Sequence, residues 1–364
     1  MKFNNKNVRK IKLALTTSCN ADCNYCFVKK TNEVMPLSVA RAAVDLLIES
    51  QGEEKLLSIY GGEPFLEIAL FKNIVQYAFD LAIENKKKLV ISVATSLTIL
   101  DDDLIAFIKT YDIKISVSLA GDKKNHNQYR FFKGGSGTYD VVLANLLKLR
   151  KKIPLQNIGI SFVIIPSQSK KIYDYFTDLL ALGVSDNINF EIVQEFEDWT
   201  KEYQDNFIRG YEKVLKEFLK NIGTNGMPKF YINPVNWEFD RQFIGGLQGV
   251  ACPFQHTLEV YPSGEVAFSP FLLNRDDKKK FVIANLKEKK FLKYEKCSFD
   301  ITREECQKCE REYYGGVINN DHAHIVRRYY YLATIEAVKY FRKKIEKNKY
   351  DKSAIQAAIK ARCF

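Results

Sequence analysis

The sequence predicts an α/β fold built around a parallel sheet, and two observations support this prediction. Apolar runs of strand length alternate with longer segments of helical period, as in repeated βα units. Motifs rich in cysteine, glycine or polar residues follow directly after several of the predicted strands. With 364 residues, of which 46% are hydrophobic and 27% charged, the chain can bury a large core.

The alternation comprises six strands with five helices between them. The predicted strands are Lys12–Thr16, Leu56–Tyr60, Leu89–Ala94, Ile113–Leu119, Ile158–Ile164 and Asn189–Val193. The predicted helices are Leu37–Gln51, Phe65–Asn85, Asp101–Tyr111, Tyr139–Lys151 and Lys170–Leu182. We expect Asp101, and either Ser167 or Ser169, to cap helix N-termini, because their side chains can accept hydrogen bonds from free backbone N–H groups.

The rest of the chain departs from this alternation. Trp199–Ile222 has the spacing of an amphipathic helix, and Gly223–Pro228 is a cluster of helix breakers that predicts a linker. Tyr261–Val266 is typical of a hairpin turn. His322–Asn348 predicts a helix whose many aromatic side chains pack in a core.

Three cysteines follow the first predicted strand. Cys19, Cys23 and Cys26 form a C-x3-C-x2-C triplet within eight residues. Three thiolates can hold three corners of a cubane iron–sulfur cluster and leave one iron open, whereas a closed cluster takes four. A structural zinc site is the alternative, but it normally uses four Cys or His ligands, and no histidine lies nearby in the sequence.

With Tyr25 directly before the last cysteine, the triplet resembles the signature of the radical S-adenosylmethionine (SAM) superfamily. The resemblance implies that the three cysteines hold a [4Fe–4S] cluster whose open iron binds SAM. It also implies that an electron from the cluster splits SAM to give a 5′-deoxyadenosyl radical, which abstracts a substrate hydrogen. The fold implied is a partial (β/α)6 barrel of the radical SAM type, with active groups at the carboxyl ends of its strands.

A second motif, Tyr60-Gly-Gly-Glu-Pro, follows the second predicted strand. Two glycines allow a sharp turn and a close approach to a ligand, and proline can begin the next helix. By itself this is an ordinary strand-to-helix turn. After the cysteine triplet it resembles the G-G-E-P motif of the superfamily, which implies SAM-binding roles for Gly61, Gly62, Glu63 and Pro64.

Later strand ends also resemble the superfamily. Ser118 and Arg130 match positions that contact the SAM ribose and the SAM carboxylate, respectively, although a surface salt bridge is the alternative for Arg130. Ala120 replaces the usual aspartate of the S-L-D-G segment. Thr95 and Ser96 lie where many relatives have T-N-G-T, and we expect a turn there, with polar contacts as the alternative.

The C-terminal part contains a second group of cysteines, Cys252, Cys297, Cys306 and Cys309. Four cysteines could bind zinc. Their order around the hairpin, however, resembles the SPASM/Twitch extension of radical SAM enzymes, which binds auxiliary [4Fe–4S] clusters. Ser269 stands where that pattern has a cysteine, so the resemblance implies one auxiliary cluster. The resemblance also implies a division of the chain into a partial barrel (1–222), an auxiliary iron–sulfur region (223–320) and a C-terminal helical segment (321–364).

Composition limits the location and the partners. The formal charge of +11 comes from scattered lysines without a nucleic-acid-binding module, which favours a solvated surface over a nucleic-acid partner. No apolar run of membrane-spanning length and no secretion signal is present, and the eight cysteines occur mostly in ligand-like spacings. We therefore expect no membrane association and a reducing, cytoplasmic location.

The resemblance favours an enzyme that modifies a ribosomally synthesised peptide by crosslinking, epimerisation or oxidation. The alternatives are a small-molecule dehydrogenase that oxidises an aminocyclitol-type alcohol, and a zinc-stapled binding protein. The expected partners are a precursor peptide, a separate leader-recognition protein, and an electron donor such as flavodoxin or ferredoxin.

Cys363 and Glu191 are candidates for catalysis, although Cys363 could be a stray terminal thiol. Gln194 and Glu195 could also face the substrate.

Overall fold

The structure is a computed structural model that describes residues 8–193, 196–243, 257–267, 282–291 and 321–362. Its centre is a mixed sheet with the strand order β11-β10-β9-β8-β1-β2-β3-β4-β5-β6-β7. The strands from β1 to β7 are parallel to one another: β1 (Lys10–Thr16), β2 (Glu54–Gly61), β3 (Lys88–Thr95), β4 (Lys114–Ser118), β5 (Ile158–Ile164), β6 (Asn187–Ile192) and β7 (Tyr231–Ile232). The predicted α/β class with six main parallel strands is therefore confirmed.

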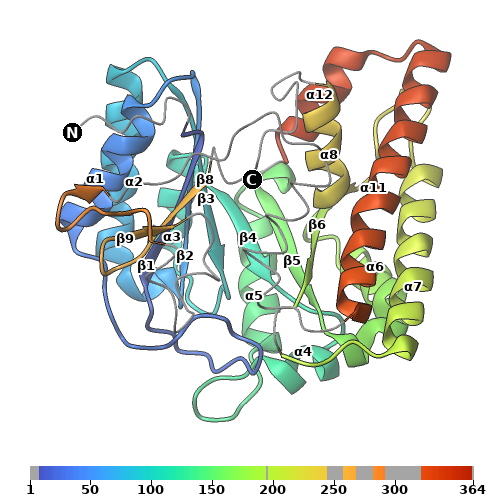
Figure 1. Ribbon diagram of the computed structural model, residues 1–364, viewed down its shortest axis with the longest axis horizontal. Helices are drawn as coiled ribbons and strands as arrows, with labels where there is room; N and C mark the ends of the chain where they lie inside the picture. Colours follow the sequence, from blue (N-terminus) through green and yellow to red (C-terminus); the bar gives the residue numbers. More distant parts are fainter. Residues whose placement is uncertain (1–7, 194–195, 244–256, 268–281, 292–320, 363–364) are drawn as a thin grey trace.

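Helices follow the strands and cover one face of this sheet (Figure 1). The connections between β1 and β7 contain α1 (Leu37–Glu49), α2 (Ile68–Glu84), α3 (Asp102–Thr110), α4 (Lys123–Tyr129), α5 (Tyr139–Arg150), α6 (Ile172–Ala181) and α7 (Lys201–Lys220). Short 3-10 helices, at Pro64–Glu67, Leu155–Asn157 and Pro166–Lys171, precede α2, β5 and α6.

The two faces of the sheet differ in the side chains they carry, as β1 illustrates. Ile11, Leu13 and Leu15 are fully buried in the main apolar core. Lys10 and Lys12 alternate with them and therefore point to the opposite face. One face of the strand thus packs on helices, and the other carries polar groups.

The C-terminal part of the chain adds elements at both ends of the sheet. β8 (Thr257–Val260) pairs in parallel with β1, and the hairpin continues antiparallel into β9 (Glu265–Ala267), β10 (Ala284–Asn285) and β11 (Lys290–Phe291). At the other end lie α8 (Asn233–Phe243), α11 (Asp321–Asn348) and α12 (Lys352–Lys360). Figure 1 shows α11 running beside α7 and α8, and Tyr211 of α7 bonds Thr334 of α11 through their hydroxyls at 2.8 Å.

Most predicted elements are confirmed, and the predicted caps give a mixed result. Asp101 caps α3 by accepting a hydrogen bond from the Leu104 backbone N–H. The predicted cap at Ser167 or Ser169 is wrong: Pro166 begins a 3-10 helix, so α6 starts only at Ile172, after both serines. The predicted hairpin at 261–266 is confirmed by the pairing of Val260 with Val266.

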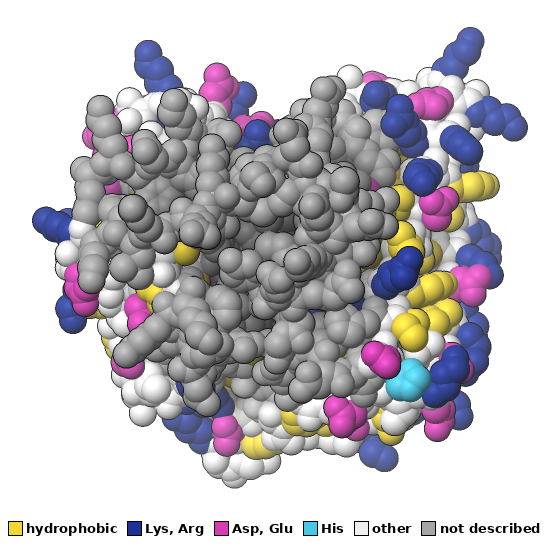
Figure 2. All heavy atoms as spheres, in the orientation of Figure 1, with side chains coloured by type: hydrophobic (Ala, Val, Ile, Leu, Met, Phe, Trp, Pro, Cys, Tyr) yellow, Lys and Arg dark blue, Asp and Glu magenta, His cyan; other side chains and the backbone are white. Residues whose placement is uncertain are grey.

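The surface agrees with the composition. Among the described residues on the face drawn in Figure 2, Lys and Arg side chains lie around the rim and are interspersed with Asp and Glu. No described helix is both long and apolar enough to cross a membrane.

His126, in α4, should make the stability of the fold depend on pH. Burial lowers its pKa from 6.5 to about 3, because the enclosed ring cannot hydrate a positive charge, and the positive charge of Arg130 contributes to the lowering. As pH falls below 6.5, the unfolded chain binds a proton that the folded chain excludes, so stability should fall towards pH 3, by up to about 1.4 kcal/mol per pH unit.

Urea unfolding between pH 7 and pH 5 would measure this contribution. His126→Gln is the control, because it keeps an acceptor and a donor but does not titrate. A pH dependence that is the same in both proteins would contradict the assignment to His126.

Candidate functional site

The predicted cysteine triplet lies on the loop that follows β1, at the carboxyl end of the parallel strands. Cys19 and Cys23 are partly buried, Cys26 is exposed, and all three are free thiols. The loop has no regular secondary structure of its own, so its position depends on the groups that hold it from both sides.

The Gly-Gly motif holds the loop on one side. The Gly62 N–H donates to Thr16 O at 2.7 Å, and the Glu63 N–H donates to Ser18 O at 2.8 Å. A Cβ atom on Gly61 would lie 2.3 Å from Thr16 O, and one on Gly62 would lie 1.9 Å from Ser18 O. Glycine is therefore required at both positions. The structure shows that the pair brings the backbone against the cysteine loop, and its close approach to a ligand stays a prediction.

The end of α4 and the residues that follow it hold the loop on the other side. Asp22 N–H donates to Phe131 O at 2.7 Å, and Asn24 N–H donates to Tyr129 O at 3.1 Å. The Arg130 guanidinium donates to the Tyr25 hydroxyl at 2.8 Å and lies 5.8 Å from the centre of the Tyr25 ring. Arg130 therefore contacts the loop between two of the cysteines, and its role towards SAM stays a prediction.

Glu63 extends a buried carboxylate from the second motif. The side chain is fully buried and accepts hydrogen bonds from Thr95 Oγ1 at 2.7 Å and from the Ser96 backbone N–H at 2.8 Å. Ser96 Oγ and the Phe65 N–H are its other donors. The polar contacts considered for Thr95 and Ser96 are therefore present, and their acceptor is Glu63. Pro64 starts the following 3-10 helix, as predicted.

Ser118 and Glu191 lie at other strand ends. Ser118 is the last residue of β4 and pairs in register with Ser161. Glu191 is exposed near the end of β6 and accepts from Asn189 Nδ2 at 2.6 Å. Glu191 follows Phe190, which is buried in the main apolar core, so the side chain of Glu191 points to the opposite face of the sheet. The contact of Ser118 with the SAM ribose and the catalytic role of Glu191 stay predictions.

Several predicted residues lie outside the described part of the chain. They are Gln194, Glu195, Cys252, Ser269, Cys297, Cys306, Cys309 and Cys363.

The donor set of the triplet fits an iron–sulfur cluster. Three free thiols come from one loop, and in a cubane each thiolate binds a different iron. Burial raises the pKa of the Cys19 thiol, so this group stays protonated until a cation binds beside it. Among the described residues, no three His, Cys, Asp or Glu side chains surround a single ion-sized position.

Sequence reasoning missed an ionic group beneath the loop. Lys12 Nζ lies 2.8 Å from Oε1 of Glu259, a fully buried residue of β8. Tyr60 packs beside Ala14 and Tyr261 on the same face, and burial raises the pKa of both Glu259 and Tyr60. The alternation of Lys and Ile at the start of β1 was the available signal, because the lysines must point away from the apolar core.

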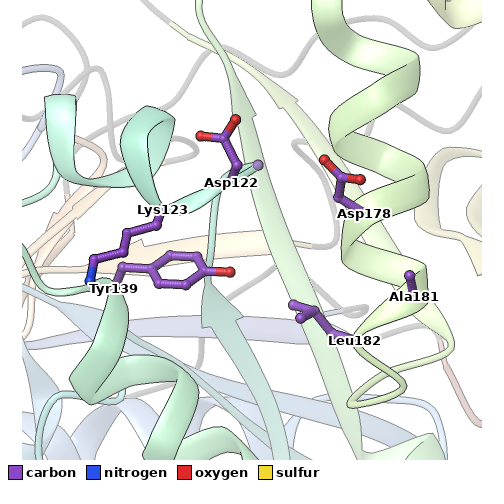
Figure 3. A pocket seen from close by; sticks show the side chains of 7 residues that line it. Asp122, Lys123, Tyr139, Asp178, Ala181 and Leu182 are labelled. Carbon is purple, nitrogen blue, oxygen red and sulfur yellow. The ribbon is translucent and has the colours of Figure 1, made fainter.

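A shallow hollow on the surface is separate from these residues. Figure 3 shows that Asp122, at the start of α4, and Asp178, on α6, line it together with Tyr139. Asp122 already caps α4 by accepting from the Asn125 N–H at 2.7 Å. None of the three cysteines, the glycine pair or Arg130 lines this hollow.

The close approach of the glycine pair can be tested with Gly62→Ala. The new methyl group would overlap Ser18 O, so the two turns must separate, and we expect iron bound per chain after anaerobic reconstitution to fall by about half or more. Gly134→Ala is the matched control, because a Cβ there meets nothing within 4 Å. Equal iron uptake by the two variants would show that the close approach is not required.

Comparison with known proteins agrees with this geometry. Residues 13–179 match the family model described as the Radical SAM superfamily. An uncharacterized protein of Methanocaldococcus jannaschii is 25% identical over 253 residues, which cover 66% of this chain and 86% of that protein. The cysteine-type anaerobic sulfatase-maturating enzyme of Clostridium novyi is 23% identical over 171 residues, which cover 44% of this chain and 46% of that enzyme.

A similar solved structure is native anSMEcpe with bound AdoMet and Cp18Cys peptide. It is 17% identical, with a TM-score of 0.67 over 92% of this chain and 99% of that one. At this identity the likeness shows a shared fold. The family match identifies residues 13–179 as a radical SAM domain, and the protein is therefore a radical SAM enzyme, of a family that uses a [4Fe–4S] cluster and S-adenosylmethionine.

Proposed function

We propose that this radical SAM enzyme modifies a ribosomally synthesised peptide by crosslinking, epimerisation or oxidation. The observation that carries the proposal is the shared fold, over nearly the whole chain, with a structure solved with a bound peptide. The relationship to a sulfatase-maturating enzyme, which acts on a protein, supports the same substrate class. The basic composition would suit an acidic leader sequence.

We assign the cluster to Cys19, Cys23 and Cys26. When bound, cluster and SAM supply the radical that abstracts hydrogen. The chain fixes the position of the three thiols through the turns described above. Because the Glu63 carboxylate already accepts four hydrogen bonds, we assign SAM contact in this motif to the backbone of Gly61, Gly62, Glu63 and Pro64. Arg130 would bind the SAM carboxylate through those of its N–H groups that do not contact Tyr25. Ser118 would contact the SAM ribose.

We further propose one auxiliary cluster held by Cys252, Cys306 and Cys309, with Cys297 as the fourth ligand. In the sequence Cys252 shortly precedes β8, and β8 pairs directly with β1, the strand that leads into the first cysteine loop.

The proposed partners are the precursor peptide, a separate leader-recognition protein and a flavodoxin- or ferredoxin-like electron donor. Free thiolate ligands require a reducing compartment, so we place the enzyme in the cytoplasm.

The substrate class is tested by anaerobic coexpression with candidate precursor peptides. We expect a mass change in the peptide, together with peptide-dependent release of 5′-deoxyadenosine by the purified enzyme. Cys26→Ala is the control and should abolish both signals, because it removes a ligand of the SAM-binding cluster. Release that is stimulated by an aminocyclitol and by no peptide would replace the proposal with the small-molecule dehydrogenase.

The auxiliary cluster is tested by Cys309→Ala. We expect this variant to lose about half of roughly eight irons per chain, to keep SAM cleavage and to lose most peptide product. Cys363→Ala, measured in the same assays, tests the candidate catalytic thiol: loss of product with full iron content and SAM cleavage would support a catalytic role, and wild-type behaviour would identify a stray thiol. Complete loss of SAM cleavage in Cys309→Ala would instead indicate that the second cysteine group stabilises the whole fold, and bound zinc in place of iron would support a structural zinc site.

A further inference from the structure

A continuous line of polar side chains joins the Glu63 carboxylate to the cysteine loop. Ser96 Oγ donates to Glu63 Oε2, and Ser96 Oγ lies 3.0 Å from Thr98 Oγ1. Asn20 Nδ2, in the loop between Cys19 and Cys23, donates to Thr98 Oγ1 at 3.0 Å. The line therefore crosses from the end of β2, over the end of β3, to the residue beside the first cysteine.

The hydrogen bonds in this line run in one direction. A carboxylate only accepts, so the single hydroxyl proton of Ser96 is committed to Glu63. Ser96 can then only accept from Thr98, which commits the Thr98 proton to Ser96. Thr98 then accepts from Asn20 Nδ2 at 3.0 Å, the shorter of its two contacts with the Asn20 amide, the other being 3.3 Å to Oδ1. Each hydroxyl thus donates once and accepts once within the line. Hydrogen bonds aligned in this way polarise one another, which strengthens the line in a buried environment.

The β3 end of the line is held by further contacts. Leu97 lies between the two hydroxyl residues with φ at 56°, a conformation uncommon for a bulky residue, and its side chain is fully buried. Its N–H donates to Thr95 Oγ1 at 2.8 Å, and its carbonyl accepts from Asn145 Nδ2 at 2.9 Å. The surrounding structure therefore fixes the segment after β3 that presents Ser96 and Thr98.

We propose that Asn20, Ser96 and Thr98 are positioning residues, which anchor the Cys19–Cys23 segment to the buried Glu63 carboxylate. The backbone bonds of Gly62 and Glu63 reach the loop only as far as Ser18, so this side-chain line is a separate attachment that lies beyond Cys19. The inference rests on cluster ligation by the three cysteines. It does not depend on the peptide substrate.

Thr98→Val tests the proposal, because valine keeps the shape of threonine but can neither donate to Ser96 nor accept from Asn20. Glu63 keeps all of its donors in this variant. In cluster-free protein, we expect Cys19 and Cys23 to be alkylated about tenfold faster than in the wild type, the factor that corresponds to loss of the part-buried bond to Asn20, which is the one of the two lost bonds that reaches the loop. Thr98→Ser should restore the wild-type rate. In reconstituted enzyme, dithionite-driven SAM cleavage without peptide should fall by a similar factor.

Thr110→Val is the matched control, because the Thr110 hydroxyl is exposed and bonds a carbonyl of its own helix, Ala106 O. Wild-type alkylation rates in Thr98→Val, or equal acceleration in Thr110→Val, would overturn the proposal. Asn20→Ala, in the partly exposed loop, provides a second variant if Thr98→Val does not fold. Adding Thr98→Val to Asn20→Ala should cause little further change, since both remove the same bond, and fully additive effects would also overturn the proposal.

These measurements use no peptide, so their failure leaves the proposed substrate untouched. A negative result in the peptide coexpression likewise leaves the anchoring of the loop intact.

Discussion

The site depends on one constraint. Two backbone turns touch with no side chain between them, and this contact fixes the start of the cysteine loop. The Gly61–Gly62 turn at the end of β2 lies against Thr16 and Ser18 at the end of β1, at a separation that only glycine permits. The loop that carries the thiols therefore starts from a fixed position although it has no regular structure. Preorganisation of this kind reduces the ordering that must occur when a cofactor binds.

The sheet supplies the rest of the arrangement through its two different faces. Apolar residues at alternate positions pack on the helices, while Lys12, Tyr60 and Glu259 occupy the other face beneath the cysteine loop. A buried ion pair of this kind contributes little net stability compared with an apolar replacement. The pair therefore makes this face of the sheet polar without contributing much to stability.

Local patterns in the sequence predicted much of this fold. Strand β5 was predicted to the residue, and the cap at Asp101 and the hairpin before Val266 follow from residue types alone. Helix α4 was missed because its sequence, Lys-Lys-Asn-His-Asn-Gln-Tyr, has almost no apolar residues and hence no helical hydrophobic period. Glu63 was predicted as part of a SAM-binding motif, and that role stays a prediction. The hydrogen-bond donors to its carboxylate were not predicted, because they come from the next strand end, at a sequence separation of 32. No local pattern encodes such a pairing.

The pairing of β1 with β8 also has a consequence for synthesis of the chain. In the finished sheet β1 lies between β2 and β8, and Lys10 pairs with Thr257. A ribosome makes the N-terminal residues first, so β1 and β2 can pair long before β8 emerges. Until then, one edge of the strand that presents the cysteines has unpaired N–H and C=O groups, which can pair with other chains. The nascent enzyme therefore depends on late residues to close the edge beside its own cluster loop.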